Sequence, residues 1–186
     1  MTDVVVLPGG RFGPAAGLLA YAVAVAERRG GMVIRHDWTP PVPDPFQPAA
    51  ESWVAGEVMS VLDLIEVTPL LIGKSLGSTA AAVAADQGLA AVWLTPLLTM
   101  PWVVAALSRC SAPFLLVGGT ADDLWDGAAA RRLSAHVCEV DGADHGMMVA
   151  TGPLADSVTA LGTVLEAIDT FLDAIGWQPE ASRSTD

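Results

Sequence analysis

Basic residues are scarce in this sequence. Its 186 residues include nine Lys and Arg against 21 Asp and Glu, so the formal net charge is −12. Binding to nucleic acid or to an anionic membrane surface needs clustered positive charge that neutralises phosphate groups. We therefore expect neither partner.

Cysteine is also scarce. Cys110 and Cys138 are the only two, the sequence has no CxxC motif, and no histidine lies at metal-ligand spacing from either one. A disulfide framework or a structural zinc site needs more ligands than these. We expect two reduced, structural cysteines and no metal site.

Long membrane-spanning segments are missing, although 52% of the residues are hydrophobic and the mean hydropathy is +0.48. The longest uncharged run lies between Asp86 and Arg109, and Pro96 and Pro101 interrupt it. It therefore predicts a buried strand followed by a pocket-lining loop. The N-terminal stretch MTDVVVLPGG lacks the basic region and the long apolar region of a secretory signal, so we expect a cytoplasmic protein.

The sequence does contain short apolar runs that alternate with helical segments. Runs rich in Val, Ile and Leu predict strands over residues 3–7, 32–36, 69–73, 90–94, 113–117 and 137–140. Helices are predicted over residues 15–29, 51–66, 76–87, 102–108, 127–134 and 153–175. This order is typical of a mostly parallel sheet covered by helices on both faces.

We therefore expect one α/β domain over residues 1–177, built as a three-layer α/β/α sandwich with a six-stranded sheet. Residues 178–186 are polar and are expected to form a flexible tail. Residues 40–48, which we call the proline segment, hold five prolines and must form an extended connection. Phe46 of this segment is a candidate for the border of a pocket.

The stretch LLIGKSLGST at residues 70–79 contains two overlapping motifs. GKS ends the phosphate-binding loop of many nucleotide-binding proteins, but that loop needs a glycine where this chain has Thr68. The overlapping G-x-S-x-G pattern fits better, because a predicted strand and helix flank it and would present Ser75 as a nucleophile at a sharp corner. Lys74 occupies a variable position of this motif, and we interpret it as a solvated charge.

A second nucleotide-binding pattern also fits poorly. The loop GGRFG at residues 9–13, with Asp37 after the second predicted strand, is similar to the layout of dinucleotide-binding folds. With Gly13 as the third glycine of that pattern, however, the first required position holds Pro8. Dinucleotide binding is therefore a minor alternative.

A serine nucleophile needs a base, and the base needs a carboxylate that orients it. Asp122 and Asp123 follow the predicted strand 113–117, and His145 follows the predicted strand 137–140. The order Ser75, Asp122, His145 therefore predicts a catalytic triad at the carboxyl ends of the strands. His36 precedes the serine, His136 begins a strand, and Asp144 suits a turn, so we interpret these three as structural.

In four ordered stretches the sequence resembles the α/β-hydrolases, specifically small, lidless, esterase-like members related to dienelactone hydrolases and carboxylesterases. The stretches are LPGG at residues 7–10, GKSLG at 73–77, GGTAD at 118–122 and GADHG at 142–146. The resemblance implies Ser75 as nucleophile, His145 as general base and Asp122 as the acid, with Asp123 as the fallback.

The resemblance also implies an oxyanion hole. Its donors would be the backbone N–H of Leu76 and one N–H from the first loop, for which we favour Gly10 and then Arg11. Pro8 and Gly9 stand where the family often has His-Gly. Candidate pocket walls are the apolar side chains near strand ends, with Phe12 and Trp102 preferred and with Leu98, Met100, Trp38, Trp93 and Trp125 as further candidates.

The function implied by this resemblance is hydrolysis of a small carboxylic ester, thioester or lactone through an acyl-enzyme on Ser75, without a cofactor. Only residues 95–112 separate the fourth and fifth predicted strands, so no cap is expected and the site should be open to small or protruding acyl groups. An acyltransferase or a non-catalytic interaction module on the same fold is the alternative. The sequence also leaves a homodimer open.

Overall fold

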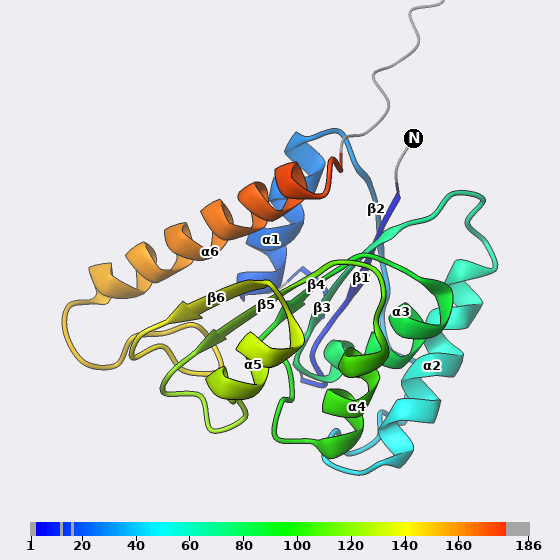
Figure 1. Ribbon diagram of the computed structural model, residues 1–186, viewed down its shortest axis with the longest axis horizontal. Helices are drawn as coiled ribbons and strands as arrows, with labels where there is room; N and C mark the ends of the chain where they lie inside the picture. The colour runs from blue at the N-terminus through cyan, green and yellow to red at the C-terminus, as the bar shows by residue number, and fades with distance from the viewer. Residues whose placement is uncertain (1–2, 12, 16, 178–186) are drawn as a thin grey trace, which may run out of the picture.

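The computed structural model describes residues 3–11, 13–15 and 17–177, so the expected tail over 178–186 lies outside the described residues. Six parallel strands form one sheet in the order β2-β1-β3-β4-β5-β6 (Figure 1). The strands are β1 (Asp3–Leu7), β2 (Met32–Arg35), β3 (Leu70–Lys74), β4 (Ala91–Leu94), β5 (Phe114–Gly119) and β6 (His136–Val140).

Helices cover both faces of this sheet. One face packs against α1 (Gly17–Arg28) and α6 (Leu154–Ala174), and the other packs against α2 (Ala49–Leu62), α3 (Ala81–Gln87), α4 (Pro101–Arg109) and α5 (Gly127–Leu133) (Figure 1). The predicted three-layer α/β/α arrangement is therefore confirmed. None of the helices in the described ranges is long and apolar enough to span a membrane.

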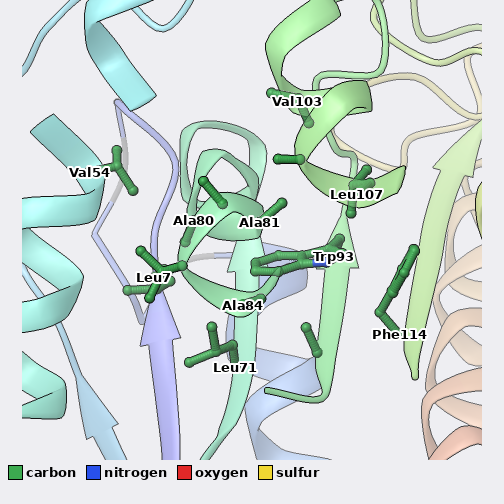
Figure 2. Close-up of a cluster of buried hydrophobic side chains, with 14 of the residues drawn as sticks. Leu7, Val54, Leu71, Ala80, Ala81, Ala84, Trp93, Val103, Leu107 and Phe114 are labelled. Carbon is green, nitrogen blue, oxygen red and sulfur yellow. The ribbon is translucent and has the colours of Figure 1, made fainter. Parts of the chain in front are cut away.

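Alternate residues of each central strand enter the two apolar layers. In β1, Val5 and Leu7 belong to the cluster on the α2 side, whereas Val4 and Val6 belong to the cluster under α1 and α6. Figure 2 shows the first cluster, where Trp93 of β4 lies among side chains from α3, α4 and the neighbouring strands. Strands that are buried on both faces need continuous apolar runs, which explains why they were predictable.

Two predicted helices differ from the structure. The helix expected over 51–66 ends at Leu62, because the backbone N–H groups of Leu64 and Ile65 donate to the carbonyls of Val61 and Leu62 and tighten the last turn. The helix expected over 76–87 starts as a 3₁₀ segment, η1 (Ser75–Ala80), before α3 begins. The other elements agree with their predicted bounds within two residues.

The sheet order places a crevice at the carboxyl ends of β1 and β3. The chain passes from β1 outward to β2 and then returns to form β3 on the other side of β1. Loops after β1 and β3 therefore diverge to opposite faces, and such a reversal point is where open α/β sheets bind ligands. Ser75 directly follows β3 at this point.

The packing of Gly77 supports a stability prediction. A Cβ at this position would overlap the carbonyl group of Leu7, which belongs to the backbone of β1. We expect Gly77→Ala to lower the free energy of unfolding by about 1–3 kcal/mol, the usual cost of overpacking. Denaturant unfolding measures the change.

Gly56→Ala is the matched control, because no atom outside its own helix backbone lies within 4 Å of a Cβ there. This control should gain up to about 1 kcal/mol from helix propensity. A Gly77→Ala protein as stable as the control would contradict the close packing of β1 and η1.

Candidate active site

Ser75 lies at the corner where β3 ends and η1 begins. Its φ of 52° is a left-handed backbone conformation that residues with a side chain rarely adopt. The corner can be this tight because glycine has no Cβ. A Cβ at Gly73 would lie only 2.6 Å from the Trp93 ring, and one at Gly77 would overlap Leu7. The two glycines of the GKSLG motif thus allow β3 and η1 to approach β1, and they leave Ser75 half-buried at the sheet edge.

Ser78 stabilises this corner from inside the molecule. Its hydroxyl donates to the carbonyl of Ser75 at 2.6 Å and accepts from the backbone N–H of Leu97 at 3.2 Å. Ser78 is buried, so both hydrogen bonds lie in a protected environment. The corner is thereby linked to the segment that follows β4.

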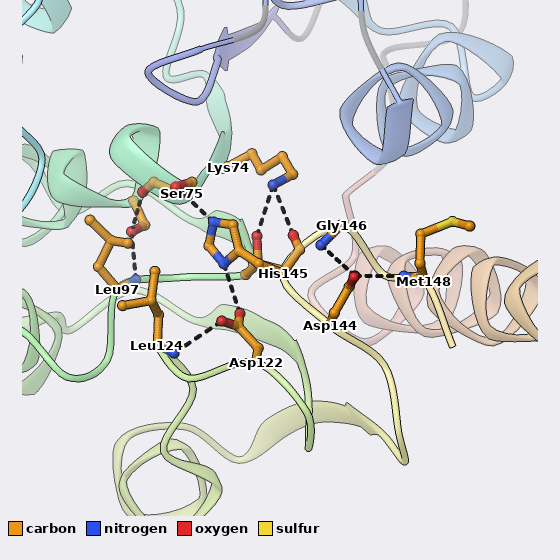
Figure 3. Close-up of polar contacts among 11 residues, drawn as sticks. Lys74, Ser75, Leu97, Asp122, Leu124, Asp144, His145, Gly146 and Met148 are labelled. Carbon is orange, nitrogen blue, oxygen red and sulfur yellow. Dashed lines mark hydrogen bonds and ion pairs between the residues drawn. The ribbon is translucent and has the colours of Figure 1, made fainter. Parts of the chain in front are cut away.

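The structure brings Ser75, His145 and Asp122 together (Figure 3). His145 Nε2 lies 2.9 Å from Ser75 Oγ, and His145 Nδ1 lies 2.8 Å from Asp122 Oδ2. An ionised carboxylate can only accept hydrogen bonds, so this pairing assigns the ring proton to Nδ1. Nε2 then carries a lone pair directed at the serine hydroxyl, which is the arrangement that removes a proton from a nucleophile.

Hydrogen bonds within their own loops hold Asp122 and His145 in place. The side chain of Asp122 is buried, and its second oxygen accepts from the backbone N–H of Leu124 at 3.0 Å. Asp144 Oδ1 accepts from the N–H groups of Gly146 at 2.8 Å and Met148 at 2.9 Å, which confirms its interpretation as a turn residue. These bonds fix the loops on both sides of the His145 ring.

The alternative acid and bases lie elsewhere. Asp123 is exposed, and His145 pairs with Asp122 in the described part of the chain. His36 Nε2 lies 2.9 Å from Glu57 Oε2, and the ring of His136 packs edge-on against Phe171. These contacts agree with a structural role for both histidines.

The loop after β1 lies against the serine corner. A Cβ on Gly9 would lie 3.6 Å from Ser75 Cβ, and one on Gly10 would lie 3.6 Å from a methyl carbon of Leu76. The indole N–H of Trp38 donates to the carbonyl of Pro8 at 3.1 Å and fixes the first peptide of this loop. Sequence reasoning did not assign this support to Trp38, although its place just after β2 was a signal that it lies near the site.

A groove with a cavity volume of about 710 Å³ opens beside Ser75 and His145. Its polar lining includes Gly10 and Arg11, the two favoured oxyanion residues, together with Lys74. Its apolar wall comes from the start of α1, the proline segment and the loop after β5, and it consists of Leu18, Leu19, Val42, Pro43, Pro45, Phe46 and Leu124. Phe46 therefore borders this pocket, as the sequence indicated.

Other candidate wall residues are not found at this groove. Leu98 is 3% exposed within the cluster of Figure 2, and Trp102 packs against the same cluster from the first turn of α4. Trp93 is fully buried below the serine corner. Leu98 and Trp102 follow β4 as predicted, but this segment folds back onto the core. Phe12, the other preferred residue, lies outside the described residues.

Lys74 differs from its interpretation as a solvated charge. Its Nζ donates to Thr95 Oγ1 at 3.1 Å and to the backbone carbonyl of His145 at 3.1 Å (Figure 3). Burial lowers the pKa of Lys74 from its ordinary value, and the charges of Asp122 and Asp144 partly oppose this shift. Lys74 is therefore part of the polar structure around the site.

The two cysteines lie away from this chemistry. Both thiols are free, and burial raises the pKa of Cys110 to about 11 and also raises the pKa of Cys138. A thiol with a raised pKa is a poor nucleophile at neutral pH. Within the described ranges, no group of three or more His, Cys, Asp or Glu side chains is placed to hold a metal ion.

No protein-family model and no curated protein matches this sequence. Solved structures do match the fold. Est1E from Butyrivibrio proteoclasticus is 14% identical with a TM-score of 0.73, and the match covers 94% of this chain and 88% of Est1E. A monoacylglycerol lipase from Paleococcus ferrophilus is 16% identical with a TM-score of 0.66, and the match covers 91% of this chain and 94% of the lipase.

An α/β serine hydrolase without a lid, from Xanthomonas campestris, is 16% identical with a TM-score of 0.62, and the match covers 97% of this chain and 83% of that protein. In the present chain, the described residues between β4 and β5 add only the short helix α4. The chain therefore has the α/β-hydrolase fold in a small form, and its described residues hold no lid between β4 and β5.

Proposed function

We propose that this chain is a serine hydrolase that cleaves a small carboxylic ester, or a thioester or lactone. The observation that carries the proposal is the hydrogen-bonded series of Ser75, His145 and Asp122 at the edge of an open groove. A serine hydroxyl is a weak nucleophile unless an adjacent base takes its proton, and here the base is in contact with it.

In the proposed reaction, Ser75 Oγ attacks the carbonyl carbon of the substrate while His145 Nε2 takes the hydroxyl proton. The negative charge that forms on the carbonyl oxygen is stabilised by the backbone N–H of Leu76 and by that of Gly10 or Arg11. The ester C–O bond then breaks, and the protonated His145 donates its proton to the leaving alkoxide. Water attacks the acyl-enzyme by the same route, which releases the acid and restores the serine.

The role of Asp122 is to keep His145 in the productive tautomer and to stabilise the imidazolium during each step. Its burial strengthens this pairing, since few water molecules compete for the carboxylate. The apolar wall of the groove suits an apolar acyl or alcohol group, because polar groups there would lose their hydration without gaining partners.

The first prediction concerns the nucleophile. Ser75→Ala should abolish hydrolysis of a short-chain aryl ester and covalent labelling by a fluorophosphonate, because the attacking oxygen is absent. Ser60→Ala, which removes a hydroxyl from the exposed face of α2, is the matched control and should keep both activities. Equal labelling of the Ser75→Ala protein would refute the assignment.

The second prediction separates the two neighbouring acids. Asp122→Asn should lower kcat by up to about 10⁴-fold, because an amide no longer selects the productive histidine tautomer. Asp123→Asn neutralises the adjacent exposed carboxylate and should leave kcat within about twofold, as expected for a surface substitution. Steady-state kinetics on one aryl ester decide the matter, and the reverse ranking would assign the acid to Asp123.

The third prediction concerns the groove. Phe46→Ala should raise KM about tenfold or less for esters with longer apolar chains, the loss expected from one partly exposed aromatic contact, and should leave short acetate esters unchanged. Tyr21→Ala, an exposed aromatic outside the groove lining, is the control. Chromogenic esters of graded chain length measure the effect, and an unchanged chain-length profile would place the substrate away from the proline segment.

A further inference from the structure

Lys74 is the only lysine in the sequence, and it lies directly before the proposed nucleophile. The ammonium of an exposed lysine keeps its full hydration. The Lys74 ammonium is half-buried and has lost part of its hydration. Two hydrogen bonds to neutral acceptors, Thr95 Oγ1 and the carbonyl of His145, compensate for that loss. The charged group therefore has a specific set of partners.

Lys74 and its two partners belong to three different segments at the carboxyl edge of the sheet. Lys74 is the last residue of β3, Thr95 directly follows β4, and His145 lies in the loop after β6. Strand pairing already joins β3 to β4 here, because Lys74 is paired with Leu94. The bond to the His145 carbonyl is different, since it joins β3 to a loop that follows β6, three strands away in the sheet. Its bond to His145 acts on the backbone of the residue whose ring contacts Ser75.

Residues with strained backbone conformations lie close to the Lys74 ammonium or to its hydrogen-bond partners. Among the described residues, the non-glycine residues with positive φ are Ser75 at 52°, Thr95 at 41° and Met147 at 64°. Lys74 is adjacent to Ser75, donates to the side chain of Thr95, and donates to the carbonyl two residues before Met147. Such conformations are energetically unfavourable and persist only where surrounding contacts enforce them. Thr95 is fully buried and β-branched, for which a positive φ is a clear outlier.

We propose that Lys74 is a positioning residue whose ammonium group ties the His145 loop and the end of β4 to the strand that carries Ser75. The imidazole is thereby kept at hydrogen-bonding distance from the serine hydroxyl. This inference rests on the proposed function, because its effect is measured through the reactivity of Ser75.

The test compares two variants of Lys74 with the wild-type protein. Lys74→Met keeps the length of the side chain but removes its donors, and we expect kcat and the rate of fluorophosphonate labelling to fall about 10²-fold, the cost of a small misplacement of reacting groups. KM should change much less than kcat. Lys74→Arg restores donors and charge and should recover part of the lost rate, which a purely space-filling role would not produce.

Thr95→Val supplies a second variant that keeps the β-branched shape and removes one acceptor of Lys74. It should lose less activity than Lys74→Met, because the bond to the His145 carbonyl remains. Thermal unfolding of every variant accompanies the kinetics. Labelling of Lys74→Met within about twofold of wild type would overturn the proposal.

NMR of the wild-type protein gives a test that needs no substitution. Because the sequence has one lysine, its side-chain ammonium and ε-carbon signals need no assignment among lysines. We expect these signals to titrate below the ordinary value of 10.5 and to shift when Ser75 is phosphonylated. Titration at or above 10.5 with no shift on phosphonylation would overturn the positioning role, even if Lys74→Met fails to fold.

The two proposals fail in different ways. If the wild-type protein neither hydrolyses the ester panel nor reacts with a fluorophosphonate, the hydrolase proposal fails, and the titration still decides whether the Lys74 ammonium is buried. If wild type is active and Lys74→Met matches it, only the positioning role fails.

Discussion

The close approach of Gly77 to the backbone of Leu7 is the constraint on which the candidate site depends. It draws η1 against β1, so the chain must turn sharply within a single residue after the end of β3. That residue is Ser75, and its left-handed conformation follows from the lack of space on either side. The same approach sets the loop of Gly9 beside the serine, so the corner and the neighbouring N–H groups are placed by one packing contact.

A strained corner is useful only if its partners are equally well fixed. The sheet itself cannot fix them, because the ends of β5 and β6 are followed by loops. Local hydrogen bonds do so: Asp122 accepts from Leu124, and Asp144 accepts from two N–H groups beside His145. Rigid elements thus set the approximate positions of the three side chains, and short polar contacts set their final geometry.

Much of the fold could be predicted because its signals are local. Strands that are buried on both faces must be apolar throughout, and a parallel sheet collects its strand ends at one edge, so Ser75, Asp122 and His145 could be grouped from their order alone. Side-chain direction could not be predicted. Leu98 and Trp102 follow β4 as expected, yet the segment folds back and carries them into the core.

Lys74 and Trp38 show the same limit. A motif with a variable position carries no information about where that side chain points, and the contacts of Lys74 come from residues 21 and 71 positions away. The bond from Trp38 to the carbonyl of Pro8 likewise spans 30 positions. Such contacts depend on the assembled sheet, so local patterns along the chain do not encode them.

Part of the groove wall, in contrast, is held by contacts within its own loop. Phe46 and its neighbours follow β2, and the turn there is closed by local bonds, in which Asp44 accepts from the backbone N–H groups of Phe46 and Gln47. Ser75, Asp122 and His145 all come later in the chain, after β3, and of the groups in the proposed chemistry only the N–H of Gly10 or Arg11 comes earlier. The part of the wall supplied by the proline segment is therefore encoded apart from the three side chains of the proposed triad, and grafting a different connection between β2 and α2 offers a route to a reshaped groove that leaves the serine corner intact.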